Sequence, residues 1–259
     1  MSLTQALLRP GEPPPVELVN PDGQGNLVLV CDHASNRVPA SLNQLGLSEE
    51  QLASHIGWDP GAARIARRLS LRLDAPLVLS NYSGLVIDCN RWPSDPESIP
   101  ESSAGITIPG NIELADQEAA CRCETLFVPY QAAIARLLTS PRETPRYLLS
   151  IHSFTHSLAG IDRPWSIGVC YRLDAQLARS WCDALISRIN LAPAGTSSNG
   201  VDGLVGDNEP YKIEADCDYT IPVQGERRGI PSIMLELRQD KIQDEIDVQA
   251  WSDLIAESW

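Results

Sequence analysis

Short apolar runs alternate along this chain with segments in which apolar residues recur at helical spacing. The runs contain β-branched residues and are bounded by turn residues, which is typical of strands covered on both faces. They lie at residues 26–31, 76–80, 83–88, 147–151, 165–171 and 231–237. Helical spacing is found at residues 49–55, 112–139, 175–189 and 244–258, and a further helix of about four turns is expected to start at residues 58–60 and to end near residue 72. This alternation predicts an α/β fold with a mixed, mostly parallel sheet flanked by helices.

The segment before the first run differs from the rest of the chain. Residues 1–25 are rich in Pro, Gly and Asn, so we expect an irregular lead-in there. Residues 26–259 contain no repeat and no obvious linker, and we expect them to form one domain.

Composition and charge narrow the class of protein. The chain is 43% hydrophobic and 21% charged, which excludes intrinsic disorder. Its net charge of −14 repels phosphate groups, so neither nucleic acid nor an anionic membrane is an expected partner. The seven Cys include no CxxC pair and several lie in apolar runs, which indicates buried reduced thiols and a cytoplasmic location. We recognise neither a signal peptide nor a membrane-spanning stretch.

Polar side chains follow four of the predicted strands. In open α/β sheets, ligands bind outside the carboxyl ends of the strands. These ends carry Asp32 and His33, Asn90 and Arg91, His152 and Ser153, and Glu236 and Arg238. Any one of them alone is more commonly a capping, turn or ion-pairing residue. Because four strand ends meet at one edge of the sheet, we expect a functional site there.

The residue types at this edge suit a metal-dependent hydrolase. Neutral imidazoles are good zinc ligands, and a carboxylate beside the metal can act as general base. Asp59 lies just before a predicted helix, where it is either an N-cap or the oxygen ligand that completes a zinc site. His55 lies four residues before it, whereas we expect His156 to be a hydrogen-bonding loop residue. The chain lacks GxGxxG, Walker A and GxSxG motifs, which argues against dinucleotide, P-loop and serine-hydrolase chemistry.

Six segments together resemble the N-formylglutamate amidohydrolase family. They are VCDHASNRVP, HIGWDPGA, GLVIDCNRWP, LLSIHSFTH, GDNEPY and IMLELRQD, and the resemblance runs from about residue 26 to 242. SIHSF, NR and ELR are also distantly similar to strand-end segments of zinc carboxypeptidases. The resemblance implies a fold like that of zinc exopeptidases and phosphorylase/hydrolase proteins.

The resemblance also implies roles for the metal-binding and catalytic residues. His33 and His152 correspond to zinc ligands, and Glu236 corresponds to the general base. Position 36 is Asn where the wider motif has the ligand Glu, so we favour Asp59 over Asn36 as the third ligand.

Other residues correspond to substrate-binding positions. Arg91 is expected both to hold a substrate carboxylate and to stabilise the oxyanion, since its planar fork pairs with carboxylates. The remaining substrate-binding candidates are Asn36, Asn90, Ser153 and Arg238. Gln224 stands in a segment where members of the family often carry His.

The reaction implied is the zinc-dependent hydrolysis of a small acidic N-acyl amino acid. The example is N-formyl-L-glutamate, which gives formate and L-glutamate in histidine degradation. Another metal-dependent deacylase or a small carboxypeptidase remains possible, and so does a non-catalytic binding protein for an acidic metabolite. Turnover of different acyl substrates and metal content would separate these classes.

Overall fold

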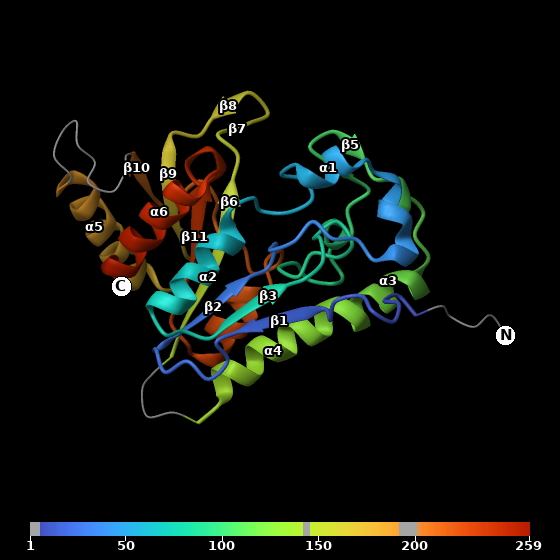
Figure 1. Cartoon of the computed structure of the whole chain (residues 1–259), viewed down its shortest axis with the longest axis horizontal. Coiled ribbons are helices and arrows are strands. Elements are labelled where there is room, and N and C mark those ends of the chain that lie inside the picture. The colour runs from blue at the N-terminus through green and yellow to red at the C-terminus, as the bar shows by residue number, and fades with distance from the viewer. Residues whose placement is uncertain (1–5, 142–145, 192–200, 202) are drawn as a thin grey trace.

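The described residues form one α/β domain around a seven-stranded sheet with helices on both faces (Figure 1). The structure is a computed structural model, and it describes all of the chain except residues 1–5, 142–145, 192–200 and 202. The strand order is β1-β3-β2-β6-β11-β9-β10. The predicted architecture, a mixed and mostly parallel sheet flanked by helices, is confirmed.

The sheet strands largely follow the apolar runs of the sequence. They are β1 (Val16–Val19), β2 (Leu27–Cys31), β3 (Leu77–Ser80), β6 (Tyr147–Phe154), β9 (Trp165–Cys170), β10 (Leu204–Asp207) and β11 (Ser232–Arg238). Two short hairpins lie outside the sheet: β4 (Ser102–Ser103) pairs with β5 (Ile106–Thr107), and β7 (Ser157–Leu158) pairs with β8 (Ile161–Asp162).

The helices also fall close to the ranges that the spacing predicts. They are α1 (Glu49–Ala53), α2 (Ala62–Arg72), α3 (Asp116–Arg122), α4 (Val128–Thr139), α5 (Ala175–Leu191) and α6 (Glu245–Ser258). A π-helical turn, Cys123–Phe127, joins α3 to α4, and in it the Val128 N–H donates to the Cys123 carbonyl. Pro129 follows at once, and its missing N–H gives a local reason for the altered bonding.

Strand direction places a binding edge at the middle of the sheet. β3, β2, β6 and β11 run parallel, whereas β1 and β9 pair antiparallel with β3 and β11. From β2 the chain passes through α2 to β3, and it then returns through α4 to β6 on the other side of β2. The strand order therefore reverses between β2 and β6, where open α/β sheets bind their ligands.

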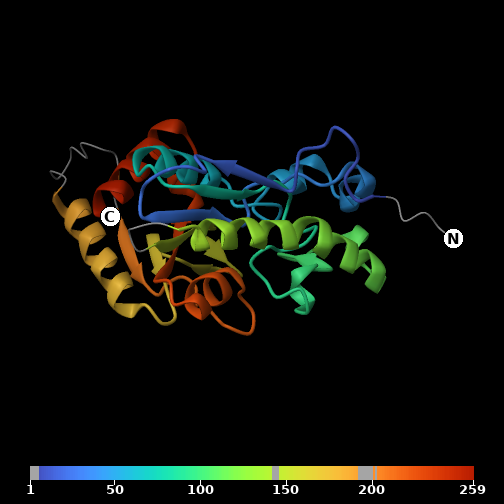
Figure 2. The same cartoon turned by 90° about the horizontal axis from the view of Figure 1, so that it is seen from below.

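Side chains alternate between two cores, one on each face of the sheet. Leu29, Ile151 and Leu235 pack in the core shared with α2, α5 and α6, whereas Val30 and Met234 pack in the core shared with α4 (Figure 2). On the α4 face of β6 and β11 the apolar residues give way to polar ones at the carboxyl edge. The alternation of β6 and β11 therefore aims His152 and Glu236 into the edge where the site lies.

Two expectations about local structure are wrong. Residues 83–88 were expected to form a strand, but they form a turn in which Val86 N–H donates to the Ser83 carbonyl. Leu85, Val86 and Ile87 are buried in a separate apolar cluster beneath the loops. A short apolar run indicates that its side chains are buried, but it does not show whether a sheet or packed loops bury them. Here the loops bury them.

The lead-in is the second correction. Val16–Val19 is not irregular: it forms the edge strand β1, which pairs with β3 from Val16 opposite Ser80 to Val19 opposite Leu77. Residues 1–5 of the expected lead-in lie outside the described residues. Surrounding Pro and Gly hid the strand, because an edge strand tolerates such neighbours better than a central one.

Two further observations bear on the class of protein. None of the helices in the described part of the chain is long and apolar enough to cross a membrane. All seven cysteines are free, and Cys31, Cys89, Cys170 and Cys182 are buried.

The last residue of the chain contributes to packing at the far end of the sheet. The Trp259 ring packs edge-on against the Tyr147 ring, with 4.9 Å between the ring centres, and its centre lies 5.5 Å from that of the Trp181 ring. Its indole N–H donates to Asn26 Oδ1 at 2.9 Å. We expect Trp259→Ala to lower the free energy of unfolding by about 2 kcal/mol, because a half-buried aromatic residue and its hydrogen bond are lost.

Chemical denaturation measures this effect. Ile246→Ala, in the same helix α6 but at a side chain that is 78% exposed, is the control and should change the unfolding free energy little. Equal effects of the two substitutions would contradict the prediction.

Candidate active site

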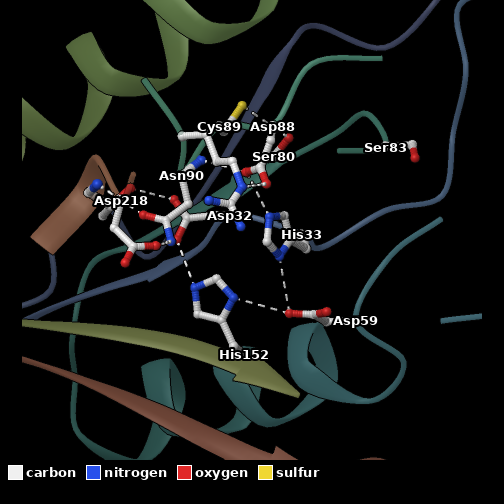
Figure 3. A network of polar contacts seen from close by, with 12 residues as sticks. Asp32, His33, Asp59, Ser80, Ser83, Asp88, Cys89, Asn90, His152 and Asp218 are labelled. Carbon is white, nitrogen blue, oxygen red and sulfur yellow. Dashed lines mark hydrogen bonds and ion pairs between the residues drawn. The ribbon is translucent and has the colours of Figure 1, made fainter. Parts of the chain in front are cut away.

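Two histidines and one aspartate converge at the edge between β2 and β6. His33 follows β2, His152 lies near the end of β6, and Asp59 precedes α2. Asp59 Oδ2 lies 3.3 Å from His33 Nδ1 and 3.1 Å from His152 Nδ1 (Figure 3). One ligand atom of each residue lies within 4.8 Å of those of the other two, so the three could hold a metal ion.

Each imidazole is held from behind by a second carboxylate. His33 Nε2 lies 2.8 Å from Asp88 Oδ1, and His152 Nε2 lies 3.0 Å from Asp32 Oδ2. A carboxylate on one ring nitrogen fixes the tautomer and leaves the other nitrogen to face the site, as in the outer shell of many metal centres. In both rings the nitrogen turned towards Asp59 is Nδ1.

Asp32 is in turn fixed by neutral donors. Ser150 Oγ and Thr220 Oγ1 donate to its two carboxylate oxygens at 2.9 Å and 2.7 Å. Asp32 is fully buried, so these bonds offset part of the cost of removing its charge from water.

Contacts between the carboxylates and the imidazoles shift the pKa values of both kinds of group. Burial lowers the pKa of His152, but hydrogen bonds to Asp32 and Asp59 outweigh this and raise it to about 10. Burial likewise opposes charge on His33, yet Asp88 and Asp59 raise its pKa well above the usual value. Asp59 has a lowered pKa because the two histidines outweigh its burial. Carboxylates and imidazoles therefore alternate through the site.

Asp59 is not the N-cap of α2. The N-cap is Gly61, which makes no side-chain cap hydrogen bond. Asp59 instead accepts the Ser153 N–H at 3.2 Å, and Ser153 Oγ donates to the Pro60 carbonyl. Ser153 therefore orients the aspartate against β6.

Glu236 lies beside this group without a comparable partner. It stands opposite His152 in the parallel pairing of β11 with β6, and it is only 4% exposed. Its Oε2 is buried and has no hydrogen-bond partner among the described residues. Burial raises the pKa of Glu236 to about 8, although His152 acts in the opposite direction. A buried carboxyl with a raised pKa is typical of general acid–base residues.

These residues line a cavity of about 330 Å³. One wall joins the loop after β3 to residues 214–220: Asn90 Nδ2 donates to Asp218 Oδ1 at 3.3 Å, and Asn90 Oδ1 accepts the Thr220 N–H at 3.0 Å. Arg91 pairs with Asp218 through its backbone, and its guanidinium lies 3.8 Å from Asp88. Asn90 thus links the walls, whereas the Arg91 side chain lines the cavity.

Two glycines shape the opposite wall. Gly168 of β9 lies opposite Glu236, so its missing side chain is on the face that carries Glu236. A Cβ at Gly168 would lie 1.8 Å from the Glu209 carbonyl oxygen, and one at Gly206 would lie 2.8 Å from it. The backbone of residue 209 therefore rests on both glycines.

This close approach brings Tyr211 and Lys212 to the cavity. Arg163 holds Tyr211 there, since its Nη1 donates to the Tyr211 hydroxyl at 2.6 Å and its guanidinium lies 5.3 Å from the ring centre. Lys212 has no hydrogen-bond or ion-pair partner among the described residues.

The structure brings most of the predicted site residues together. His33, Asp59, Asn90, Arg91, His152, Ser153 and Glu236 all line this cavity. Asn36 and Arg238 do not line it: Asn36 is half-buried on the loop after β2, and Arg238 Nε donates to Asp240 at 2.7 Å.

The remaining singled-out residues lie at or beyond the margin. His55 is exposed and lines an adjoining hollow, and His156 is exposed in the loop after β6. Gln224 is buried, and its amide donates to Gln131 Oε1 at 2.9 Å, so it stands away from the possible metal ligands.

Sequence reasoning assigned no role to four groups that shape the site. Asp32 and Asp88 were visible beside His33 and Asn90, but nothing in their spacing shows which residue holds which imidazole. Tyr211 and Lys212 follow a weak strand and reach the cavity only through the tertiary contact with Gly168. The signal that existed was Lys212 itself, since the chain has only two lysines.

Comparison with known proteins decides the family. The model of the family described as N-formylglutamate amidohydrolase matches residues 25–243. The chain belongs to the N-formylglutamate amidohydrolase family. Membership makes it a hydrolase that acts on an amide bond, and the clustered site is consistent with this.

Two solved structures are similar to this chain. A gene product of Agrobacterium tumefaciens is 31% identical, with a TM-score of 0.86 over 97% of this chain and 95% of that chain. The N-formylglutamate amidohydrolase of Ralstonia eutropha is 17% identical, with a TM-score of 0.63 over 94% of this chain and 95% of that one, and shows the shared fold. A comparison with curated proteins found no match.

The two glycines under residue 209 generate a prediction for this amidohydrolase-family chain. Gly168→Ala should lower the free energy of unfolding by about 2 kcal/mol, because the new methyl group overlaps a backbone oxygen that has to move. A crystal structure of the variant should show Tyr211 and Lys212 displaced from the cavity.

Gly105→Ala is the control. The Cβ of that residue would meet no atom within 4 Å, so only the left-handed backbone, at φ +79°, costs about 1 kcal/mol. Tyr211 in its wild-type position in Gly168→Ala would show that the glycine does not shape this wall.

Proposed function

We propose that the chain is a zinc-dependent amidohydrolase that cleaves an N-acyl amino acid, with N-formyl-L-glutamate as the first candidate substrate. The observation that carries this proposal is the convergence of His33, Asp59 and His152 beside Glu236, a buried carboxyl whose Oε2 has no hydrogen-bond partner in the part of the chain that the structure describes. The family match supports the reaction class.

The residues present fit zinc. Two imidazole nitrogens and one carboxylate oxygen form a donor set common in catalytic zinc sites, which keep a further position open for water or substrate. The carboxylates behind the imidazoles add the outer shell such ligands usually have. Zinc bound there would lower the pKa of a water molecule and polarise the amide carbonyl.

Glu236 is placed to move the protons of the reaction. As a carboxylate it accepts a proton from the attacking water, and as an acid it gives that proton to the nitrogen of the leaving amine. The new C–O bond forms first, and the amide C–N bond breaks once the nitrogen has received the proton, so the products are a carboxylic acid and the free amino acid. Burial without a compensating hydrogen bond keeps the proton affinity of Glu236 high enough for both steps.

Arg91 and Lys212 supply positive charge for the substrate. Asp59 and Asp88 contact the histidines, whereas Arg91 lines the cavity and Lys212 has no hydrogen-bond or ion-pair partner among the described residues. We assign Arg91 to the carbonyl or α-carboxylate next to the reacting bond, since its planar fork suits both. We assign Lys212 to a carboxylate farther out, such as the side chain of glutamate. Asn36 and Arg238 have no role in this proposal.

The seven free cysteines support a cytoplasmic location, where thiols stay reduced.

Glu236→Gln tests the central assignment. We expect zinc content to remain near that of the wild type, because the ligands are untouched, and kcat to fall at least about 100-fold, because the amide cannot accept a proton. Elemental analysis and a colorimetric assay for the released amine measure the two quantities on zinc-supplemented protein.

His152→Ala and His156→Ala form a matched pair for the metal site. The first removes a proposed ligand and should lose most of the zinc, whereas the second changes an exposed loop residue and should retain it. Substantial turnover by Glu236→Gln would refute the base assignment. Wild-type protein that takes up no zinc and hydrolyses no N-acyl amino acid would refute the proposed function.

Lys212→Met tests the recognition of an acidic side chain. The ratio of kcat/KM for N-formyl-L-glutamate to that for N-formyl-L-glutamine should fall about fivefold, because one solvent-accessible ion pair of about 1 kcal/mol is lost. Lys241→Met, at the other lysine, does not alter a residue of the cavity and should leave the ratio unchanged. An unchanged ratio in Lys212→Met would remove Lys212 from substrate binding.

A further inference from the structure

A second hollow of about 420 Å³ adjoins the cavity. The two spaces share five lining residues, which are His33, Asp59, Asp88, Arg91 and Tyr211. The proposed metal ligands His33 and Asp59 and the guanidinium of Arg91 therefore border both. A substrate that places its amide bond at these residues has room on each side of that bond.

The second hollow has a lining of its own. His55 comes from the turn between α1 and α2, Glu97 from the loop after β3, and Ser102 and Ser103 from strand β4. These side chains offer hydrogen-bond donors and acceptors, so the hollow suits a polar occupant. The Glu97 carboxylate has no hydrogen-bond or ion-pair partner among the described residues.

The two spaces differ in the cations that line them. Lys212 lines only the first cavity, beside Glu214 and Asp218, whereas Glu97 lines only the second hollow, whose sole Lys or Arg among the described residues is the shared Arg91. A carboxylate of the amino acid can therefore pair with Lys212 only in the first cavity, and Glu97 repels it from the second hollow. The acyl half of the substrate is left to occupy the second hollow.

Size then separates possible acyl groups. A formyl group is comparable in bulk with one or two water molecules, each of which takes up about 30 Å³. The second hollow is several times larger, and it lies within the range of about 300–1,000 Å³ that is typical of small-molecule sites. If the acyl group ended at the carbonyl carbon, the polar side chains that line the second hollow would contact only water.

We propose that the second hollow is an acyl-binding subsite, and that this chain prefers uncharged polar or cationic acyl groups larger than formyl. This inference rests on the proposed function and specifies its substrate class. Glycolyl and glycyl groups represent the class: the first offers a hydroxyl group, and the second offers an ammonium group that can pair with Glu97. A succinyl group brings a carboxylate to the same wall and is disfavoured.

A series of L-glutamate derivatives tests the proposal on the full-length, zinc-supplemented protein. The acyl groups are formyl, acetyl, glycolyl, glycyl and succinyl, and kcat/KM is measured for each from the glutamate released. We expect the glycolyl and glycyl derivatives to exceed the formyl derivative by about tenfold, which is typical of a few extra contacts in a matching pocket. The succinyl derivative should fall below them.

A matched pair of variants locates the effect. Ser102 and Ser157 are both exposed and each begins the first strand of a short hairpin, but only Ser102 lines the hollow. Ser102→Trp should lower the ratio of kcat/KM for the glycyl to that for the formyl derivative about tenfold, because the indole occupies the space of the longer acyl group. Ser157→Trp should leave the ratio as in the wild type.

Glu97→Gln separates charge from size. It should bring the kcat/KM values of the succinyl and glycyl derivatives closer together and change the ratio of glycolyl to acetyl little. A preference for formyl over every larger group, or an equal effect of Ser102→Trp on all derivatives, would overturn the acyl subsite and leave the proposed function standing. Failure of the wild type to hydrolyse any member would overturn the proposed function and the subsite together.

Discussion

An unbroken row of alternating carboxylates and imidazoles governs the edge between β2 and β6. Asp32, His152, Asp59, His33 and Asp88 follow one another, and each contact is 3.3 Å or shorter. A single charge buried here would cost several kcal/mol, whereas neighbours of opposite charge offset that cost. The row therefore holds together segments far apart in the sequence, because removing any member leaves an uncompensated charge.

Glu236 owes its properties to its exclusion from this row. It lies beside His152 on the next strand, but no imidazole or guanidinium is bonded to its buried Oε2. Stability alone would favour an apolar residue at such a position. The carboxylates of the row are paired with imidazoles, whereas Glu236 is not. The groups that hold the site in place are therefore different from the group that exchanges protons.

The sequence predicted the framework and the centre of the site more fully than its walls. His33, His152 and Glu236 could be predicted from the sequence, because each follows or ends an apolar run that predicts a strand. Parallel strands bring their carboxyl ends to one edge of the sheet. The turn at residues 83–88 could not be predicted, because its apolar residues are buried by loops and have the same sequence pattern as a buried strand. The position of Lys212 at the cavity could not be predicted either, because it depends on the contact between the backbone of residue 209 and Gly168, which no local sequence pattern encodes.

The reversed direction of β9 and β10 determines where substitutions can alter the cavity without altering the reacting groups. Both strands run against β11, so the chain leaves β10 at the far edge and has to return across the sheet to reach the site. The returning residues carry a wall of the cavity but none of the alternating row. Substitutions in this segment can therefore alter which molecules are accepted while the chemistry stays intact, so selectivity and reactivity are free to evolve separately.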